Sequence, residues 1–121
     1  DRLALVSDAV ALGGRATGVY NEGRHEILPS GKIVLAGTPY LAGAGHLLDT
    51  CIANAARLTD LTLAQATRCA STVPARILGM ENRKGHVQTG FDADLTLFRA
   101  PSDGALEIVA TVCAGEVLYR A

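Results

Sequence analysis

The chain has 121 residues, of which 49% are hydrophobic and only 4% aromatic, and its formal net charge is −1. This length suits one modest domain, and the balanced charge offers no basic surplus to attract nucleic acid or an anionic membrane. No apolar run approaches the roughly 20 residues of a membrane span, and we recognise no signal peptide. We therefore expect a protein that has neither nucleic acid nor a membrane as its partner.

The first apolar run ends at a carboxylate. Residues Leu3–Ser7 predict a strand buried on both faces, as in a parallel sheet. Asp8 follows directly, where α/β barrels and open α/β sheets carry their chemistry, although an Asp there is also a common turn former or helix cap. Because a parallel strand needs neighbours joined by crossover helices, and the chain starts on this strand, we expect it to be the C-terminal piece of a larger protein.

From Gly18 to Ala36 the pattern changes to short extended pieces. They are centred on Val19-Tyr20, Glu26–Leu28 and Lys32–Leu35, and turn-forming residues separate them. This spacing predicts a small antiparallel excursion. The glycine-rich stretch that follows, up to Gly45, is expected to be a flexible lead into a helix.

Two helices and a shorter one are predicted next. Apolar residues recur in one wide stripe over 46–58, which is typical of an amphipathic helix. Thr62 and Gln65 have the spacing of a capping box and predict the start of a second helix, which continues to Val73. A short helix, Pro74–Leu78, follows.

The remainder of the chain is β-like. Val87 is predicted to lie in a short strand, and further strands are expected over 94–98 and 106–113. The turn Ala114-Gly115-Glu116 leads into Val117–Tyr119, so the last two strands form a hairpin. We expect Asp94 to serve a turn or an interdomain hydrogen bond.

The sequence does not supply a metal site by spacing. Neither the cysteines nor the histidines stand in the close pairs that metal ligands favour; they are Cys51, Cys69, Cys113, His25, His46 and His86. Buried free thiols agree with a cytoplasmic location. Surface or capping roles are expected for the histidines.

The order of these pieces resembles the C-terminal third of the metal-dependent amidohydrolase superfamily, and most closely its N-acetylglucosamine-6-phosphate deacetylase branch. The motifs that carry the resemblance are Leu5-Val6-Ser7-Asp8, Leu35-Ala36-Gly37-Thr38, Ser71–Gly79, Gly85–Gly90 and Ala93-Asp94-Leu95. Together they span nearly the whole chain. The family loop usually continues Gly-Ser, whereas here Gly37 is followed by Thr38.

The resemblance implies a fold: the α/β class, as the C-terminal fragment of a (β/α)8 TIM barrel plus the C-terminal strands of a small β-sandwich. Residues 1–80 would supply the last barrel strand, the β-hairpin excursion and the covering helices. Residues 81–121 would supply the C-terminal part of the β-sandwich domain. A homo-oligomer, specifically a dimer, is expected.

The resemblance also implies a reaction, the deacetylation of N-acetylglucosamine 6-phosphate to glucosamine 6-phosphate and acetate, with a small-molecule amide as substrate. Asp8 maps onto the family's general base and acid, and is a possible metal ligand. Leu35, Ala36 and Gly37 match the loop that borders the substrate. A divalent metal, zinc or iron, would be held by ligands mostly upstream of residue 1, so the fragment alone is expected to be inactive.

Two alternatives remain open. A related amidohydrolase could act on another amide with the same Asp. A non-catalytic structural or oligomerising fragment is the other reading, because the exposed edge of the Leu3–Ser7 strand would favour self-association.

Overall fold

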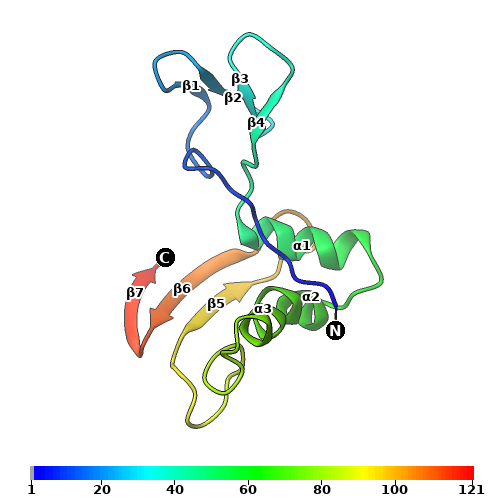
Figure 1. The fold of residues 1–121 in the computed structure, drawn as a ribbon, viewed down its shortest axis with the longest axis vertical. Helices are drawn as coiled ribbons and strands as arrows, with labels where there is room; N and C mark the ends of the chain where they lie inside the picture. The colour runs from blue at the N-terminus through cyan, green and yellow to red at the C-terminus, as the bar shows by residue number, and fades with distance from the viewer. Residues whose placement is uncertain (1) are drawn as a thin grey trace. The chain divides into compact units, whose positions relative to one another are not determined.

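The computed structural model describes residues 2–121, which form two compact units (Figure 1). The smaller unit comprises Ser7–Leu48, and the larger comprises residues 2–6 together with Asp49–Ala121. No helix in the described part of the chain has the length and apolar character needed to cross a bilayer. The proposed division at residues 80 and 81 concerns the architecture of a larger protein and stays a prediction.

The smaller unit is a four-stranded antiparallel sheet in the order β1-β2-β3-β4. Its strands are β1 Gly18–Tyr20, β2 His25–Ile27, β3 Ile33–Leu35 and β4 Leu41–Gly43. The core of this unit consists of Leu12, Ile27 and Ile33, with Tyr20 and Ala42 packed against it. The antiparallel excursion is therefore confirmed. The fourth strand was not predicted, because its glycine-rich surroundings indicated a flexible lead.

The strand predicted over Leu3–Ser7 is wrong for this structure. These residues belong to no strand, and the side chains of Leu3 and Val6 are 50% and 73% exposed. One backbone hydrogen bond, from the amide of Leu5 to the carbonyl oxygen of Cys69 (2.8 Å), ties the segment to the larger unit. The physical reason is that a parallel strand is made by backbone partners alongside it, and the described residues place none there.

Three helices follow in the larger unit: α1 Leu48–Leu58, α2 Leu63–Ala70 and α3 Thr72–Ile77. The capping box is confirmed, since the Thr62 hydroxyl accepts a hydrogen bond from the amide of Gln65 and the Gln65 side chain accepts one from the amide of Thr62. The second helix ends at Ala70 rather than at Val73. The third begins before Pro74, because a proline is tolerated in the first turn, where amide groups have no partner within the helix.

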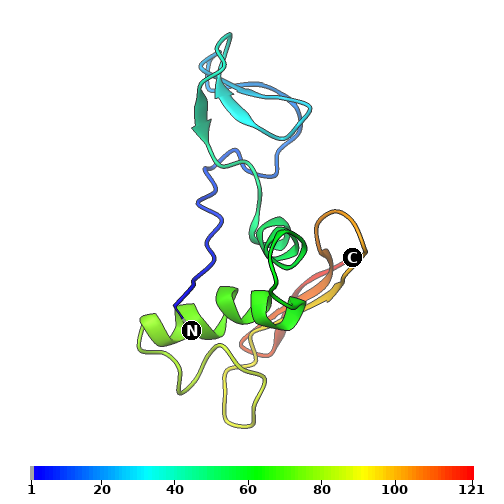
Figure 2. The same cartoon turned by 90° about the vertical axis from the view of Figure 1, so that its right-hand side faces the viewer.

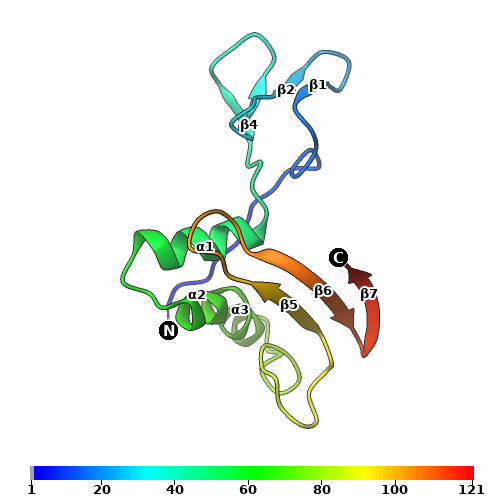
Figure 3. The ribbon, with the colours of Figure 1, turned by 180° about the vertical axis from the view of Figure 1, so that it is seen from behind.

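A three-stranded antiparallel sheet completes the larger unit, in the order β5-β6-β7. Its strands are β5 Leu95–Arg99, β6 Glu107–Cys113 and β7 Glu116–Arg120, and the helices lie on the β5 side of it (Figures 1 and 3). Ala114 and Gly115 make the tight turn of the predicted hairpin, both with positive φ (50° and 85°). The strand predicted at Val87 is wrong: the residue lies in no strand and is 88% exposed.

Candidate functional site

Asp8 lies outside the helices and strands and is exposed to solvent, in the bend Ser7–Ala9, which we call the Asp8 turn. Its φ is 49°, in the left-handed region that Asp tolerates better than most non-glycine residues. The hydroxyl oxygen of Ser7 accepts a hydrogen bond from the amide of Ala9 (3.4 Å), which spans the turn. The first described helix begins only at Leu48, so Asp8 caps no helix there and the turn is its local structural role.

The backbone that follows Asp8 pairs with the residues that follow β4. Ala9 forms a parallel bridge with Ala44, and the amide of Val10 donates to the carbonyl oxygen of Ala44 (3.2 Å). The amide of Gly14 donates to the carbonyl oxygen of Gly45 (3.3 Å). Residues 9–14 are thereby fixed against residues 44–45, within one unit.

The loop predicted to border the substrate, Leu35–Gly37, comprises the last residue of β3 and the start of its connection to β4. The amide of Leu35 donates to the carbonyl oxygen of Tyr40 (2.9 Å), and the amide and hydroxyl of Thr38 both donate to the carbonyl oxygen of Leu35 (2.9 and 2.8 Å). This turn adjoins the Leu41 end of β4, whereas Ala44 and the Asp8 turn adjoin the other end (Figures 1 and 2). The structure does not bring these residues to Asp8, and their substrate role stays a prediction.

A second copy of the same tripeptide was missed. Leu41-Ala42-Gly43 repeats Leu35-Ala36-Gly37 and forms β4 itself, so the second copy, not the first, leads to the Asp8 turn. The duplication is visible in the sequence and was the signal available. The sequence alone could not show which copy lies near Asp8, because only the pairing of Ala9 with Ala44 distinguishes the two copies.

The residues that the structure describes do not form a metal centre by themselves. Residues 2–121 contain no group of three or more His, Cys, Asp or Glu side chains that could hold a metal ion. Nδ1 of His25 lies 3.1 Å from the side-chain amide nitrogen of Asn21, and the His86 ring packs edge-on against Phe91. Asp8 contributes one carboxylate, which does not by itself fit a bound cation.

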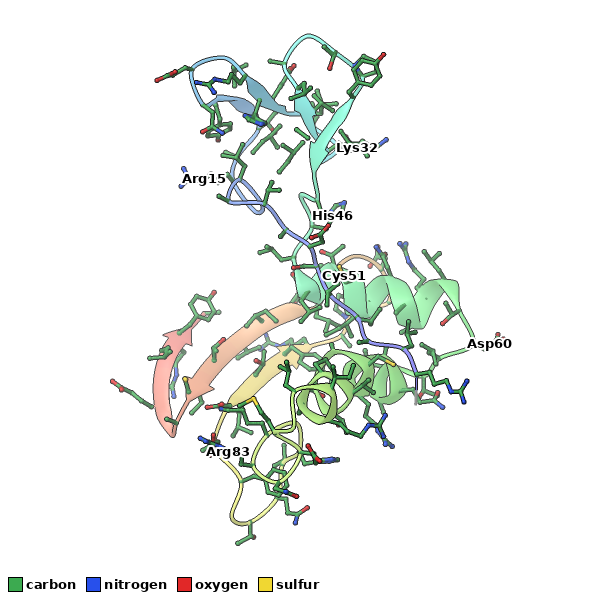
Figure 4. The ribbon with its side chains drawn as sticks, in the orientation of Figure 1. Arg15, Lys32, His46, Cys51, Asp60 and Arg83 are labelled. Atoms are coloured by element: carbon green, nitrogen blue, oxygen red, sulfur yellow. The ribbon has the colours of Figure 1, made fainter. Side chains whose placement is uncertain are left out.

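A charged cluster in the loop between α3 and β5 was also missed. Lys84 contacts the carboxylates of Asp92 (2.9 Å) and Asp94, and Arg83 contacts Asp92 (2.7 Å; Arg83 is labelled in Figure 4). Asp94 also accepts a hydrogen bond from the amide of Ala114 (2.8 Å), at the hairpin turn. The turn role expected of Asp94 is therefore confirmed.

Comparisons with known proteins place the chain in a family. The amidohydrolase family matches residues 19–118. The N-acetylglucosamine-6-phosphate deacetylase of Rattus norvegicus is 35% identical over 120 residues, which is 98% of this chain and 28% of the rat enzyme. The N-acetylgalactosamine-6-phosphate deacetylase of Escherichia coli O157:H7 is 32% identical over 90 residues, 74% of this chain and 24% of that enzyme.

Solved structures give the same result for the fold. The N-acetyl-D-glucosamine-6-phosphate deacetylase of Mycobacterium smegmatis matches with a TM-score of 0.77 and 31% identity, over 98% of this chain and 31% of that one. An aspartate-to-alanine mutant of that enzyme, solved in complex with N-acetyl-D-glucosamine-6-phosphate, matches with a TM-score of 0.75 and 31% identity over 96% of this chain and 30% of that one. The chain thus has the fold of a segment, under a third, of these deacetylases, and it belongs to the amidohydrolase family.

Proposed function

We propose that this chain is the C-terminal part of an enzyme that deacetylates N-acetylglucosamine 6-phosphate to glucosamine 6-phosphate and acetate. The observation that carries the proposal is the placing of Asp8, an exposed carboxylate at a turn, in a chain that matches such deacetylases over 98% of its length. In this proposal residues 3–7, which form no strand in this structure, become the last strand of a (β/α)8 barrel beside the strands of the full-length enzyme. The helices cover the barrel, and β5–β7 belong to a small β-sandwich.

Asp8 is suited to both proton transfers of amide hydrolysis. Its carboxylate oxygen takes a proton from water as the water oxygen bonds to the carbonyl carbon of the acetamido group. The same oxygen then gives that proton to the amide nitrogen as the carbon–nitrogen bond breaks, which releases acetate and the amine.

A divalent cation, zinc or iron, is part of the proposal for the whole enzyme. When bound, such an ion polarises the carbonyl group and lowers the pKa of water. Because residues 2–121 offer no cluster for it, we place its ligands in the part of the enzyme that precedes this chain.

The backbone that borders the substrate is also part of the proposal. Ala44-Gly45 lies beside the Asp8 turn through the pairing of Ala9 with Ala44, which favours this segment over Leu35–Gly37 as the neighbour of the reacting group. Glycine residues let a ligand approach the backbone closely.

The test is Asp8→Asn in the full-length enzyme. Asparagine keeps the size of the side chain and cannot take a proton, so we expect turnover to fall by about 10²- to 10⁴-fold. Asp60→Asn is the matched control, since Asp60 is exposed in the loop between α1 and α2 and points into solvent (Figure 4). Retention of most activity by Asp8→Asn, at unchanged metal content, would overturn the assignment.

A second substrate is favoured by a specific observation, the 32% identity to N-acetylgalactosamine-6-phosphate deacetylase. The two sugars differ only in the configuration of one hydroxyl group. The kcat/KM of the full-length enzyme on each sugar phosphate distinguishes them. Failure on both would favour another amide substrate or a structural role.

The location and assembly of the enzyme stay predictions. Three free cysteines, Cys51, Cys69 and Cys113, are consistent with the reducing cytoplasm. A homodimer is proposed for the full-length protein, and sedimentation of that protein tests it.

A further inference from the structure

The contact between Gly43 and Val10 is the closest approach of β4 to the segment that follows Asp8. A Cβ atom built on Gly43 would lie 2.3 Å from Cγ1 and 3.0 Å from Cγ2 of Val10. Real Cβ atoms are essentially never found as close as 2.3 Å to another heavy atom. Val10 therefore occupies the space that a side chain at position 43 would fill.

Turning the valine side chain does not remove this conflict. The Cβ atom of Val10 itself would lie 3.2 Å from a Cβ on Gly43, and this atom stays in place when χ1 changes. Valine is also stiff at χ1. A side chain at position 43 must therefore move the backbone of Val10 or that of β4.

The backbone of Val10 is coupled to Asp8. Val10 is two residues from Asp8, and the amide of Val10 and the bridge at Ala9 both attach to Ala44, next to Gly43. The hydrogen bond from the amide of Ala9 to Ser7 links the two neighbours of Asp8. A displacement at Val10 is thus transmitted to the Asp8 turn over a few covalent bonds.

We propose that Gly43 and Val10 are positioning residues, whose close packing sets the place of the Asp8 carboxylate relative to the scissile bond. This inference depends on the proposed function, in which Asp8 carries the proton transfers. Neither residue touches the substrate in this role. Misplacement of a catalytic group by about 1 Å can lower a rate by about 100-fold.

The test compares Gly43→Ala with Gly18→Ala in the full-length enzyme. The two glycines have nearly the same φ, 155° and 151°, in the region that other residues rarely adopt, so both variants carry the same backbone strain. At Gly18 the nearest neighbour of a new Cβ, on Tyr20, would be at an ordinary 3.7 Å. The comparison therefore isolates the contact with Val10.

We expect Gly43→Ala to lower kcat by about 10- to 100-fold relative to Gly18→Ala, with KM changed little, because Asp8 acts on the reaction and other groups bind the sugar phosphate. The double variant Val10→Ala/Gly43→Ala removes both valine methyl groups that meet the new Cβ. It should recover part of the lost kcat, because the two closest contacts, at 2.3 and 3.0 Å, are removed and only the Cβ–Cβ contact at 3.2 Å remains. Unfolding caused by the same contact would lower the amount of folded enzyme, which circular dichroism measures, so kcat is expressed per folded molecule.

A second variant covers the case in which Gly43→Ala fails to fold. Val10→Ile lengthens one of the two branches that face Gly43 and keeps the glycine at position 43, and we expect a drop in kcat of several-fold at unchanged KM. Equal kcat values for Gly43→Ala and Gly18→Ala, or no rescue in the double variant, overturn the inference. Failure of the proposed function is seen separately, as an active Asp8→Asn enzyme.

Discussion

Lys84 is the residue that joins three separate parts of the larger unit. Its ammonium group contacts Asp92 and Asp94, and Asp94 in turn accepts the amide hydrogen of Ala114 in the β6–β7 turn. The three charged side chains of this contact are 26–34% exposed, whereas the ion pair of Arg24 with Glu22 is 75% and 88% exposed. Because the contacts of Lys84 with Asp92 and Asp94 are partly shielded from water, they stabilise the fold more than the exposed pair of Arg24 with Glu22.

We therefore predict an order of stability among variants of Asp94. Asp94→Asn keeps an oxygen for the amide of Ala114 and loses the charge opposite Lys84, whereas Asp94→Ala loses both. Thermal unfolding should show the midpoint falling by a few degrees in Asp94→Asn and further in Asp94→Ala. Arg24→Gln, which removes the exposed ion pair, is the control and should leave the midpoint unchanged. Equal midpoints for the two Asp94 variants would contradict the prediction.

The same cluster predicts a dependence of stability on pH. Hydrogen bonds from Arg83 and Lys84 lower the pKa of Asp92, and the hydrogen bond from Lys84, with that from the amide of Ala114, lowers the pKa of Asp94. A carboxylate whose folded pKa is depressed stabilises the fold above its unfolded pKa, about 3.9, and loses this contribution as the pH falls through the folded pKa.

The pKa of Lys84 is raised, chiefly by its hydrogen bonds to Asp94 and Asp92. Its contribution is complete below its unfolded pKa of about 10.4 and is lost as the pH rises through the folded value. The difference in unfolding midpoint between the natural protein and Asp94→Ala should be constant near neutral pH and shrink below about pH 3.9. A difference of the same size at about pH 3 and pH 7 would rule out this origin.

At the scale of elements, the contact between α3 and the following loop depends on Gly85. The hydroxyl of Thr72 donates to the carbonyl oxygen of Gly85 (2.8 Å). A Cβ on Gly85 would lie 2.9 Å from both the Cβ of Ala75 and the Cα of Thr72. The loop can approach the helix only without a side chain at this position.

Gly85→Ala should therefore destabilise the protein more than Gly90→Ala. The φ values of the two glycines are 88° and 87°, so the backbone strain is matched, and a Cβ on Gly90 would have no neighbour within 4 Å. We expect Gly85→Ala to lower the free energy of unfolding by about 1–3 kcal/mol more than Gly90→Ala, the usual cost of overpacking. Denaturant unfolding measures this difference, and equal values would show that the loop moves freely.

Elements set by local chemistry could be predicted from the sequence, and elements made by distant partners could not. Thr62 and Gln65 cap their own helix, and Ala114-Gly115 makes its own turn, so both were found. β4 exists because Val34 pairs with Leu41 and Ile33 with Gly43, which no local pattern reveals. Residues 3–7 show the reverse case, since their apolar character indicates burial but the described residues place no strand beside them.

The residues of the candidate site also fall into two groups, those that the local sequence identifies and those that only distant pairing identifies. Asp8 could be selected from the sequence, because its place after an apolar run and its acidity are local properties. Its neighbours could not, because the pairing of Ala9 with Ala44 connects residues far apart in the chain. For the same reason the first of the two Leu-Ala-Gly copies was selected although the second leads to the Asp8 turn.

Considered as a whole molecule, the chain leaves much apolar surface in contact with water. On β7, the edge strand of its sheet, Val117, Leu118 and Tyr119 are 50%, 64% and 50% exposed. An edge strand offers unpaired backbone groups, and apolar side chains beside them favour pairing with another chain. Charged residues that normally discourage such pairing stand only at the ends of β7, at Glu116 and Arg120.

We predict that residues 1–121, produced alone, associate through β7 and have no deacetylase activity. Sedimentation velocity should show oligomers whose proportion increases with concentration, because association covers the apolar edge. Leu118→Lys should shift the population toward the monomer, since a lysine on an edge strand opposes pairing. Leu58→Lys is the matched control: Leu58 is 72% exposed at the end of α1, away from any strand edge. A monomer at all concentrations, or equal effects of the two lysines, would show that β7 does not direct the association.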